Sequence, residues 1–147
     1  MRLNTGEGSH LDFTYTLKPD DYMVQYQILG TGLNGVLAPS TNALDLSWEQ
    51  DIRQQEKGRK FEDRYVTLNY KFMADDEHLS ESKSDSKQIP NRLKWIGYKD
   101  MFFSTVLISQ EGFEATTLDS KAIPEGDVLK QFKTTASVPF DLQGKEA

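Results

Sequence analysis

The segment 92–109 is the densest apolar and aromatic run in the chain, and it strongly constrains the fold. In extended form, Leu93 and Trp95 point to one side of a strand and Ile96 and Tyr98 to the other, so both faces need cover. After Asp100 the alternation resumes, with apolar residues on both parities: Met101, Phe102, Phe103, Val106, Leu107 and Ile108. The β-branched and aromatic content and the lack of helix start signals favour strand over helix. The segment therefore predicts two buried strands joined by a bend.

Other parts of the chain alternate apolar and polar residues with the period of a strand that is buried on one face. They are 11–17, 22–28, 44–48, 66–72 and 128–142, with a shorter candidate at 114–118 after a turn at Glu111-Gly112. Pro19-Asp20-Asp21 supplies the turn of a hairpin between the first two. A charged segment, 50–60, with a turn at Gly58, follows the third of these strands. Residues 74–90 form an exposed loop with a short edge strand around Leu79. No convincing long helix remains, so the pattern predicts an all-β fold, an antiparallel β-sandwich with little helix.

The length and composition limit the number of domains in the chain and the kinds of partner that it can bind. The chain has 147 residues, enough for one sandwich domain spanning 1–147. Its net charge is −6 and no block of Lys and Arg marks a phosphate-binding face, which argues against nucleic acid as a partner. There is no cysteine, hence no disulfide and no thiolate site. No apolar run approaches the roughly 18 residues of a membrane span, so we expect a soluble segment.

A glycine pattern at 30–35 has the spacing G-x-G-x-x-G after a strand. A dinucleotide site needs a helix that begins at these glycines. Here Pro39 and Ser40 follow the glycines, and no apolar residues with helical periodicity come after them. The pattern therefore predicts a glycine-rich loop with a positive φ at Gly32 or Gly35, and no nucleotide cofactor.

The polar residues give no catalytic or metal-binding arrangement. His10 and His78 lie in a predicted loop and at a loop edge, and neither begins a spaced set of ligands. The acidic run 75–77 lacks the spacing and the glycine of a calcium loop. No nucleophile elbow or isolated carboxylate pair is present. We predict no catalytic residue, no cofactor and no metal, and hence a protein that is not an enzyme.

The large aromatic residues could line a ligand groove, but at strand spacing they more often form core. We assign Trp95 and Phe103 to the core on this ground. Tyr98 and Phe113 are the better candidates for an exposed edge that contacts a partner.

The block from Trp95 to Ile108 carries a resemblance to a known family. Lys-Trp-Ile-Gly-Tyr-Lys-Asp-Met-Phe-Phe resembles the Trp-x-Gly-x-Lys-(Asp/His)-x-Phe-Phe segment of the periplasmic domain of the bacterial membrane-protein insertase YidC, in a Bacteroidetes-like form. Other positions agree in order: Pro19-Asp-Asp-Tyr22, Leu46-Ser-Trp48 and Glu56-Lys57. We take four residues as the structural signature: Trp48, Trp95, Phe102 and Phe103. Of these, we expect Trp95, Phe102 and Phe103 to hold two sheets together.

The resemblance implies a supersandwich of the galactose mutarotase-like kind, on the periplasmic side of the inner membrane. It implies a non-enzymatic domain that assists the insertion and folding of inner-membrane proteins. The partners would be Sec translocon accessory proteins and nascent membrane proteins. The family inserts segments through its transmembrane helices, none of which is in these residues, and Arg92 is not the family's intramembrane arginine.

Two alternatives stay open beside this interpretation. A carbohydrate-binding or mutarotase-like domain would use the same sandwich, but its enzymatic form needs two histidines and a carboxylate converging on one cleft. An unrelated secreted adhesin is the other. The resemblance also suggests that the chain is a fragment, since Met1 precedes Arg-Leu-Asn-Thr-Gly directly and the family has further strands beyond both ends. Two unpaired strand edges would result, so we predict an edge-to-edge dimer or a disordered tail.

Overall fold

The computed structural model describes residues 1–72 and 74–140. The chain forms two compact units. Unit 1 comprises Met1–Leu44 and the segment from Pro139 onward, and unit 2 comprises Asp45–Val138. The single domain over 1–147 stays a prediction. The end of the last predicted strand, 141–142, and the predicted disordered tail lie outside the described residues.

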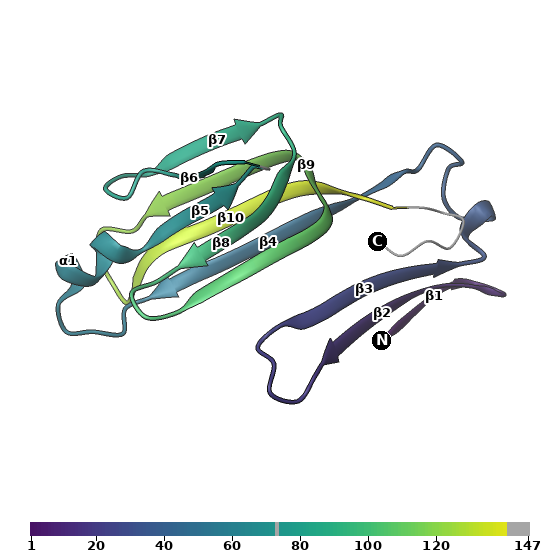
Figure 1. Cartoon of the computed structure of the whole chain (residues 1–147), viewed down its shortest axis with the longest axis horizontal. Coiled ribbons are helices and arrows are strands. Elements are labelled where there is room, and N and C mark those ends of the chain that lie inside the picture. Colours follow the sequence, from purple (N-terminus) through teal and green to yellow (C-terminus); the bar gives the residue numbers. More distant parts are fainter. Residues whose placement is uncertain (73, 141–147) are drawn as a thin grey trace. The chain divides into compact units, whose positions relative to one another are not determined.

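Unit 1 contains a three-stranded antiparallel sheet of order β1-β2-β3, made by β1 (Arg2–Gly6), β2 (Ser9–Leu17) and β3 (Val24–Thr31) (Figure 1). The strands β2 and β3 form the predicted hairpin, in which Tyr15 and Tyr26 are opposite each other and stack at 4.7 Å. In the turn between β2 and β3, Asp20 has a φ of 58° and the Asp21 carboxylate accepts a hydrogen bond from the Met23 N–H at 3.0 Å. This confirms the turn chemistry of Pro19-Asp20-Asp21.

The glycine pattern after β3 forms a tight turn followed by a single 3₁₀ turn, η1 (Leu33–Gly35). Gly32 has a φ of 65°, and a Cβ there would lie 2.5 Å from the Gly8 carbonyl oxygen. Glycine is thus required both for the backbone angle and for the close approach of two chain segments. The predicted loop is confirmed, because η1 is too short to be the helix of a dinucleotide fold.

Unit 2 holds the remaining elements. They are β4 (Ala43–Arg53, which starts in unit 1), α1 (Arg59–Glu62), η2 (Asp63–Tyr65), β5 (Thr67–Lys71), β6 (Asp76–His78), β7 (Asp85–Ile89), β8 (Leu93–Lys99), β9 (Ser104–Ala122) and β10 (Val128–Pro139). The strand order is β4-β10-β9-β8-β5-β6, with β7 added beside β9. The pairs β9–β10, β5–β6, β5–β8, β7–β9 and β8–β9 are antiparallel.

The long strand β9 belongs to two layers. Its residues 104–108 pair with β8, whereas residues 114–122 pair with β10 and 116–120 with β7. Between the two parts, Gly112 has a φ of 95° and its N–H donates to Ser109 Oγ at 2.9 Å. We expected Glu111-Gly112 to end one strand and 114–118 to form another. Here the expectation is wrong, because a bulge at Gly112 bends the strand without interrupting it.

The bend at Gly112 folds the seven-stranded sheet into a sandwich in which β6-β5-β8 with the first part of β9 covers β7, the second part of β9, β10 and β4 (Figure 1). Side chains from both layers form one hydrophobic core: Ile52, Val66, Leu68, Tyr70, Leu79, Ile89, Leu93, Ile96, Tyr98, Phe113, Leu118, Leu129, Phe132 and Ala136. The predicted all-β antiparallel sandwich with little helix is confirmed.

The charged segment 50–60, predicted as a strand end and a turn, leads into a short helix. After Gly58 the chain forms α1, whose Glu62 carboxylate is buried and accepts the N–H groups of Gln55 (2.9 and 3.1 Å) and Glu56 (3.0 Å). On the same helix, the Arg59 guanidinium donates to three carbonyls, those of Gly126 (2.7 Å), Val128 (2.8 Å) and Ile123. The helix therefore ties two connecting segments together.

We expect Glu62→Ala to lower the free energy of unfolding by about 2 kcal/mol, since it leaves two backbone donors without an acceptor. Urea denaturation of the purified chain measures this. Glu56→Ala is the matched control, because the Glu56 side chain is exposed and only its backbone joins this arrangement. Equal midpoints for the two variants would contradict the assigned role of the Glu62 carboxylate.

Candidate functional site

The two residues predicted to contact a partner are in the core. Tyr98 is 1% exposed and Phe113 is 3% exposed. Tyr98 lies on β8 between β5 and β9 and faces the opposite layer, and Phe113 sits beside Leu93 at the bulge of β9. The prediction that these rings are exposed is therefore wrong, and no observation tests the predicted partner contact.

Tyr98 instead joins the two layers of the sandwich. Its ring stacks on Trp48 of β4 at 3.7 Å and contacts Phe132 of β10 at 5.1 Å. Its hydroxyl is hydrogen-bonded to the Trp48 carbonyl at 3.0 Å and to the Thr134 hydroxyl at 2.8 Å. Burial raises the pKa of the Tyr98 hydroxyl above its ordinary value.

The other signature residues divide between the interior and the surface. Trp48 packs against the core. Trp95 is half-buried on the outer face of β8, so our assignment of Trp95 to the core is wrong. Phe102 and Phe103, however, are 59% and 73% exposed. They lie in the β8–β9 turn, where the Asp100 carboxylate accepts the N–H of Phe102 at 2.8 Å and that of Phe103 at 2.6 Å. Because that turn fixes the backbone and leaves the rings outside, our expectation that they pack between the sheets is wrong.

The outer face of β8 and β9 presents apolar side chains. Trp95 pairs with Ile108 and Gly97 with Val106 across the two strands. Ile108 and Val106 are 49% and 47% exposed. A Cβ at Gly97 would lie 3.4 Å from the Trp95 ring, in ordinary van der Waals contact, so the ring lies close to the backbone of β8 at Gly97. We call the surface formed by Trp95, Val106 and Ile108 the outer apolar face.

The sequence signal for this face was visible. Apolar residues on both parities of 92–109 required cover on both sides, and we inferred that both were buried. In the described residues, cover is present on the core side only.

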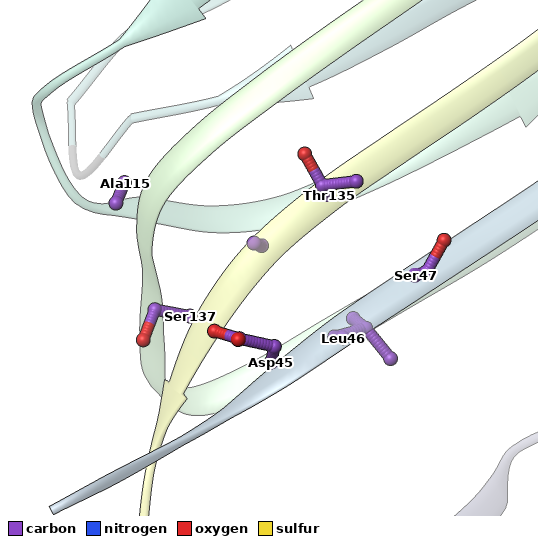
Figure 2. A pocket seen from close by; sticks show the side chains of 7 residues that line it. Asp45, Leu46, Ser47, Ala115, Thr135 and Ser137 are labelled. Carbon is purple, nitrogen blue, oxygen red and sulfur yellow. The ribbon is translucent and has the colours of Figure 1, made fainter.

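A shallow pocket of about 300 Å³ lies where β4, β9 and β10 meet, and Figure 2 shows its lining from these strands. The lining residues are Asp45, Leu46, Ser47, Ala115, Thr135, Ala136 and Ser137. Ala115 has a φ of 45°, and the pairing of β10 with β9 is irregular between Thr135 and Ser137. The pocket offers one carboxylate and three hydroxyls as hydrogen-bonding groups. These groups are suited to binding a polar group.

The charged side chains of unit 2 form structural contacts. Lys87 Nζ donates to Glu77 Oε2 at 2.7 Å and to the Tyr70 hydroxyl at 2.6 Å, which holds β7 against β5 and β6. The hydrogen bonds with Glu77 and Tyr70 raise the pKa of Lys87. The hydrogen bond from Lys87 lowers the pKa of the Glu77 carboxyl group. Over residues 1–72 and 74–140, no cluster of three or more potential ligands could hold a metal ion. In the same ranges, no helix has the length and apolarity needed to cross a membrane.

Together these features define a class: an all-β domain whose most distinctive surface is an apolar sheet face and whose polar clusters are structural. Comparison with known proteins identifies its family: the model of the family described as YidC periplasmic domain matches residues 1–146. The chain belongs to this family.

The chain is also similar to curated proteins, each named membrane protein insertase YidC. The identity is 99% for the protein of Parabacteroides distasonis, 48% for that of Azobacteroides pseudotrichonymphae and 45% for that of Bacteroides fragilis. These alignments cover 99–100% of this chain but only 23–24% of each relative. The chain thus spans about a quarter of the length of the proteins it matches. No solved structure matches it.

The comparisons confirm the predicted family and its Bacteroidetes-like form. The family match also confirms the predicted periplasmic location of this domain.

Proposed function

We propose that this domain assists the insertion and folding of inner-membrane proteins by binding apolar polypeptide on its surface. The outer apolar face is the observation that carries the proposal. An exposed apolar sheet face is costly in water, and such surfaces mark sites of interaction. The partners would be nascent membrane proteins or accessory proteins of the Sec translocon.

The carbohydrate-binding alternative has less support. Sugar-binding sites combine hydrogen-bonding groups with an aromatic ring that covers the apolar face of the sugar. The pocket at Asp45 has the polar groups, but its lining contains no aromatic residue. We therefore prefer a domain that contacts polypeptides.

Photo-crosslinking in membranes tests this proposal. With a photoreactive residue at Val106 or Ile108 of the full-length protein, we expect adducts with newly synthesised inner-membrane proteins or with Sec accessory proteins. Gln88 on β7 is the control, since it is exposed on another strand of unit 2. Adducts that are equally abundant at Gln88, or their absence at both test positions, would count against the proposal.

A further inference from the structure

One strand edge of unit 2 is unpaired over a long stretch. Residues 104–108 of β9 pair with β8 on one side, and no strand within the described ranges pairs with their other side. An unpaired edge presents a row of N–H and C=O groups that can pair with another extended chain.

The free edge of β9 lies on the same side of unit 2 as the free edge of β4. In the middle of the sandwich, Tyr98 of β8 rests on Trp48 of β4 and bonds Thr134 of β10. At the other side, Lys87 of β7 bonds Tyr70 of β5. The two layers therefore run in the same order, which places the first part of β9 beside β4 (Figure 1).

Core side chains near this open side are incompletely covered. Leu107 of β9 and Leu46 and Trp48 of β4 pack against the core but remain partly exposed. On the opposite face of β9, Val106 and Ile108 are about half exposed. The free edge of β9 is therefore bordered by apolar side chains on both faces.

The free edge of β9 also lacks the usual protection against pairing. Natural edge strands carry charged residues or proline, and the other edges of unit 2 do so: β4 has Asp45, Glu49 and Asp51, β6 has Asp76 and Glu77, and β7 has Asp85 and Lys87. Residues 104–110 contain neither a charge nor a proline. Charges resume only at Lys99 and Asp100 on one side and at Glu111 on the other.

We infer that the free edge of β9 binds an extended, uncharged polypeptide segment as an added strand. Backbone hydrogen bonds would hold the segment, as in other cases of strand addition. Its alternate side chains would lie beside Leu107 and Trp48 on one face and beside Val106 and Ile108 on the other, so the site favours apolar residues at every position. A transmembrane segment in extended form has this composition. The inference rests on the proposed function and names the kind of segment bound.

Peptide binding to the purified chain tests the inference. The probe is a synthetic peptide of seven apolar residues with charged ends for solubility, and the readout is tryptophan fluorescence. Trp48 and Trp95 are the only two tryptophans, and they flank the proposed site on its two faces. We expect saturable binding that weakens about tenfold or more when backbone N-methylation removes the N–H groups of one edge of the peptide, a loss of about 1.4 kcal/mol or more.

Two protein variants complete the test. Val106→Lys places a charge on the edge and should weaken binding about tenfold or more, whereas Val24→Lys, at a 55% exposed position of β3, should leave binding unchanged. Equal binding of the methylated and unmethylated peptides would overturn strand addition. A dimer that Val106→Lys dissociates, without peptide binding, would overturn it in favour of a second copy as the occupant, as in the predicted edge-to-edge dimer.

These outcomes separate the inference from the proposed function. Crosslinks at Val106 or Ile108 in membranes without peptide binding by the purified chain would refute strand addition and leave the proposed function standing. Peptide binding with silent crosslinks would refute the proposed function alone.

Discussion

Replacing Lys130 with methionine is expected to lower the free energy of unfolding by about 3 kcal/mol, although methionine has a similar length and suits a core. Lys130 lies on β10, its side chain is 1% exposed, and its ammonium carries three N–H donors. Each donor has an acceptor: the carbonyls of Val66 at 2.7 Å, Glu81 at 2.7 Å and Asp63 at 3.1 Å. The Lys130→Met variant leaves all three carbonyls without this donor.

The same strand provides the matched control. Lys133 is three residues further along β10, is half-exposed and pairs with Glu49 at 2.6 Å. Exposed ion pairs contribute little, so Lys133→Met should cost less than about 1 kcal/mol. Urea denaturation of both variants measures the difference, and equal midpoints would show that the three carbonyls are solvated some other way.

The pH dependence of stability gives a second readout for Lys130. Burial lowers the pKa of its ammonium below 10.5, and Asp63 opposes this shift. Between the lowered pKa and 10.5 the unfolded chain binds more protons than the folded chain, so this group makes stability rise with pH in that window. Lys130→Met should lack this contribution.

The strands could be predicted from the sequence because alternation depends on local pattern. The hairpin of β2 and β3 and the strands β4, β5 and β8 all lie where the pattern placed them. The bend of β9 could not be predicted, because a glycine at 112 is compatible with either a turn or a bulge. Only the pairing with β8 on one side and β10 on the other decides between them.

The burial of individual residues on those strands was harder to predict. Lys130 has the same parity as Phe132 and Thr134, and it is buried only because η2 and the segment near Glu81 bring carbonyls to it. We expected Tyr98 to be exposed and Phe103 to be buried, but Tyr98 is buried and Phe103 is exposed. An aromatic residue favours burial by its area alone, whereas its actual place depends on whether a second layer covers it.

The largest side-chain effect is expected at Tyr98. Tyr98→Ala should lower the free energy of unfolding by about 4 kcal/mol, because it removes a fully buried ring that stacks on Trp48 and contacts Phe132. Tyr98→Phe keeps the ring and loses only the hydroxyl, which leaves the Trp48 carbonyl and the Thr134 hydroxyl without that partner. We expect it to cost about 1.5 kcal/mol at neutral pH.

The Tyr98 hydroxyl should also make the domain sensitive to alkali. Burial raises the pKa of Tyr98 above 10.0, so the stability that this group contributes is complete below pH 10 and is lost as the pH rises further. Above pH 10 the unfolded chain releases a proton that the folded chain keeps, which costs up to about 1.4 kcal/mol per pH unit. Tyr70 adds to the fall, since its pKa is raised too, mainly by burial.

The comparison of wild type with Tyr98→Phe isolates the part of the alkaline loss due to Tyr98. Urea denaturation between pH 8 and pH 11 should show the two stability curves converging as the pH rises, because the variant has no group there to ionise. Curves that stay parallel over this range would mean that the Tyr98 hydroxyl reaches solvent in the folded state. In that case the stack on Trp48, rather than the buried hydrogen bonds, would be the main contact between the two layers.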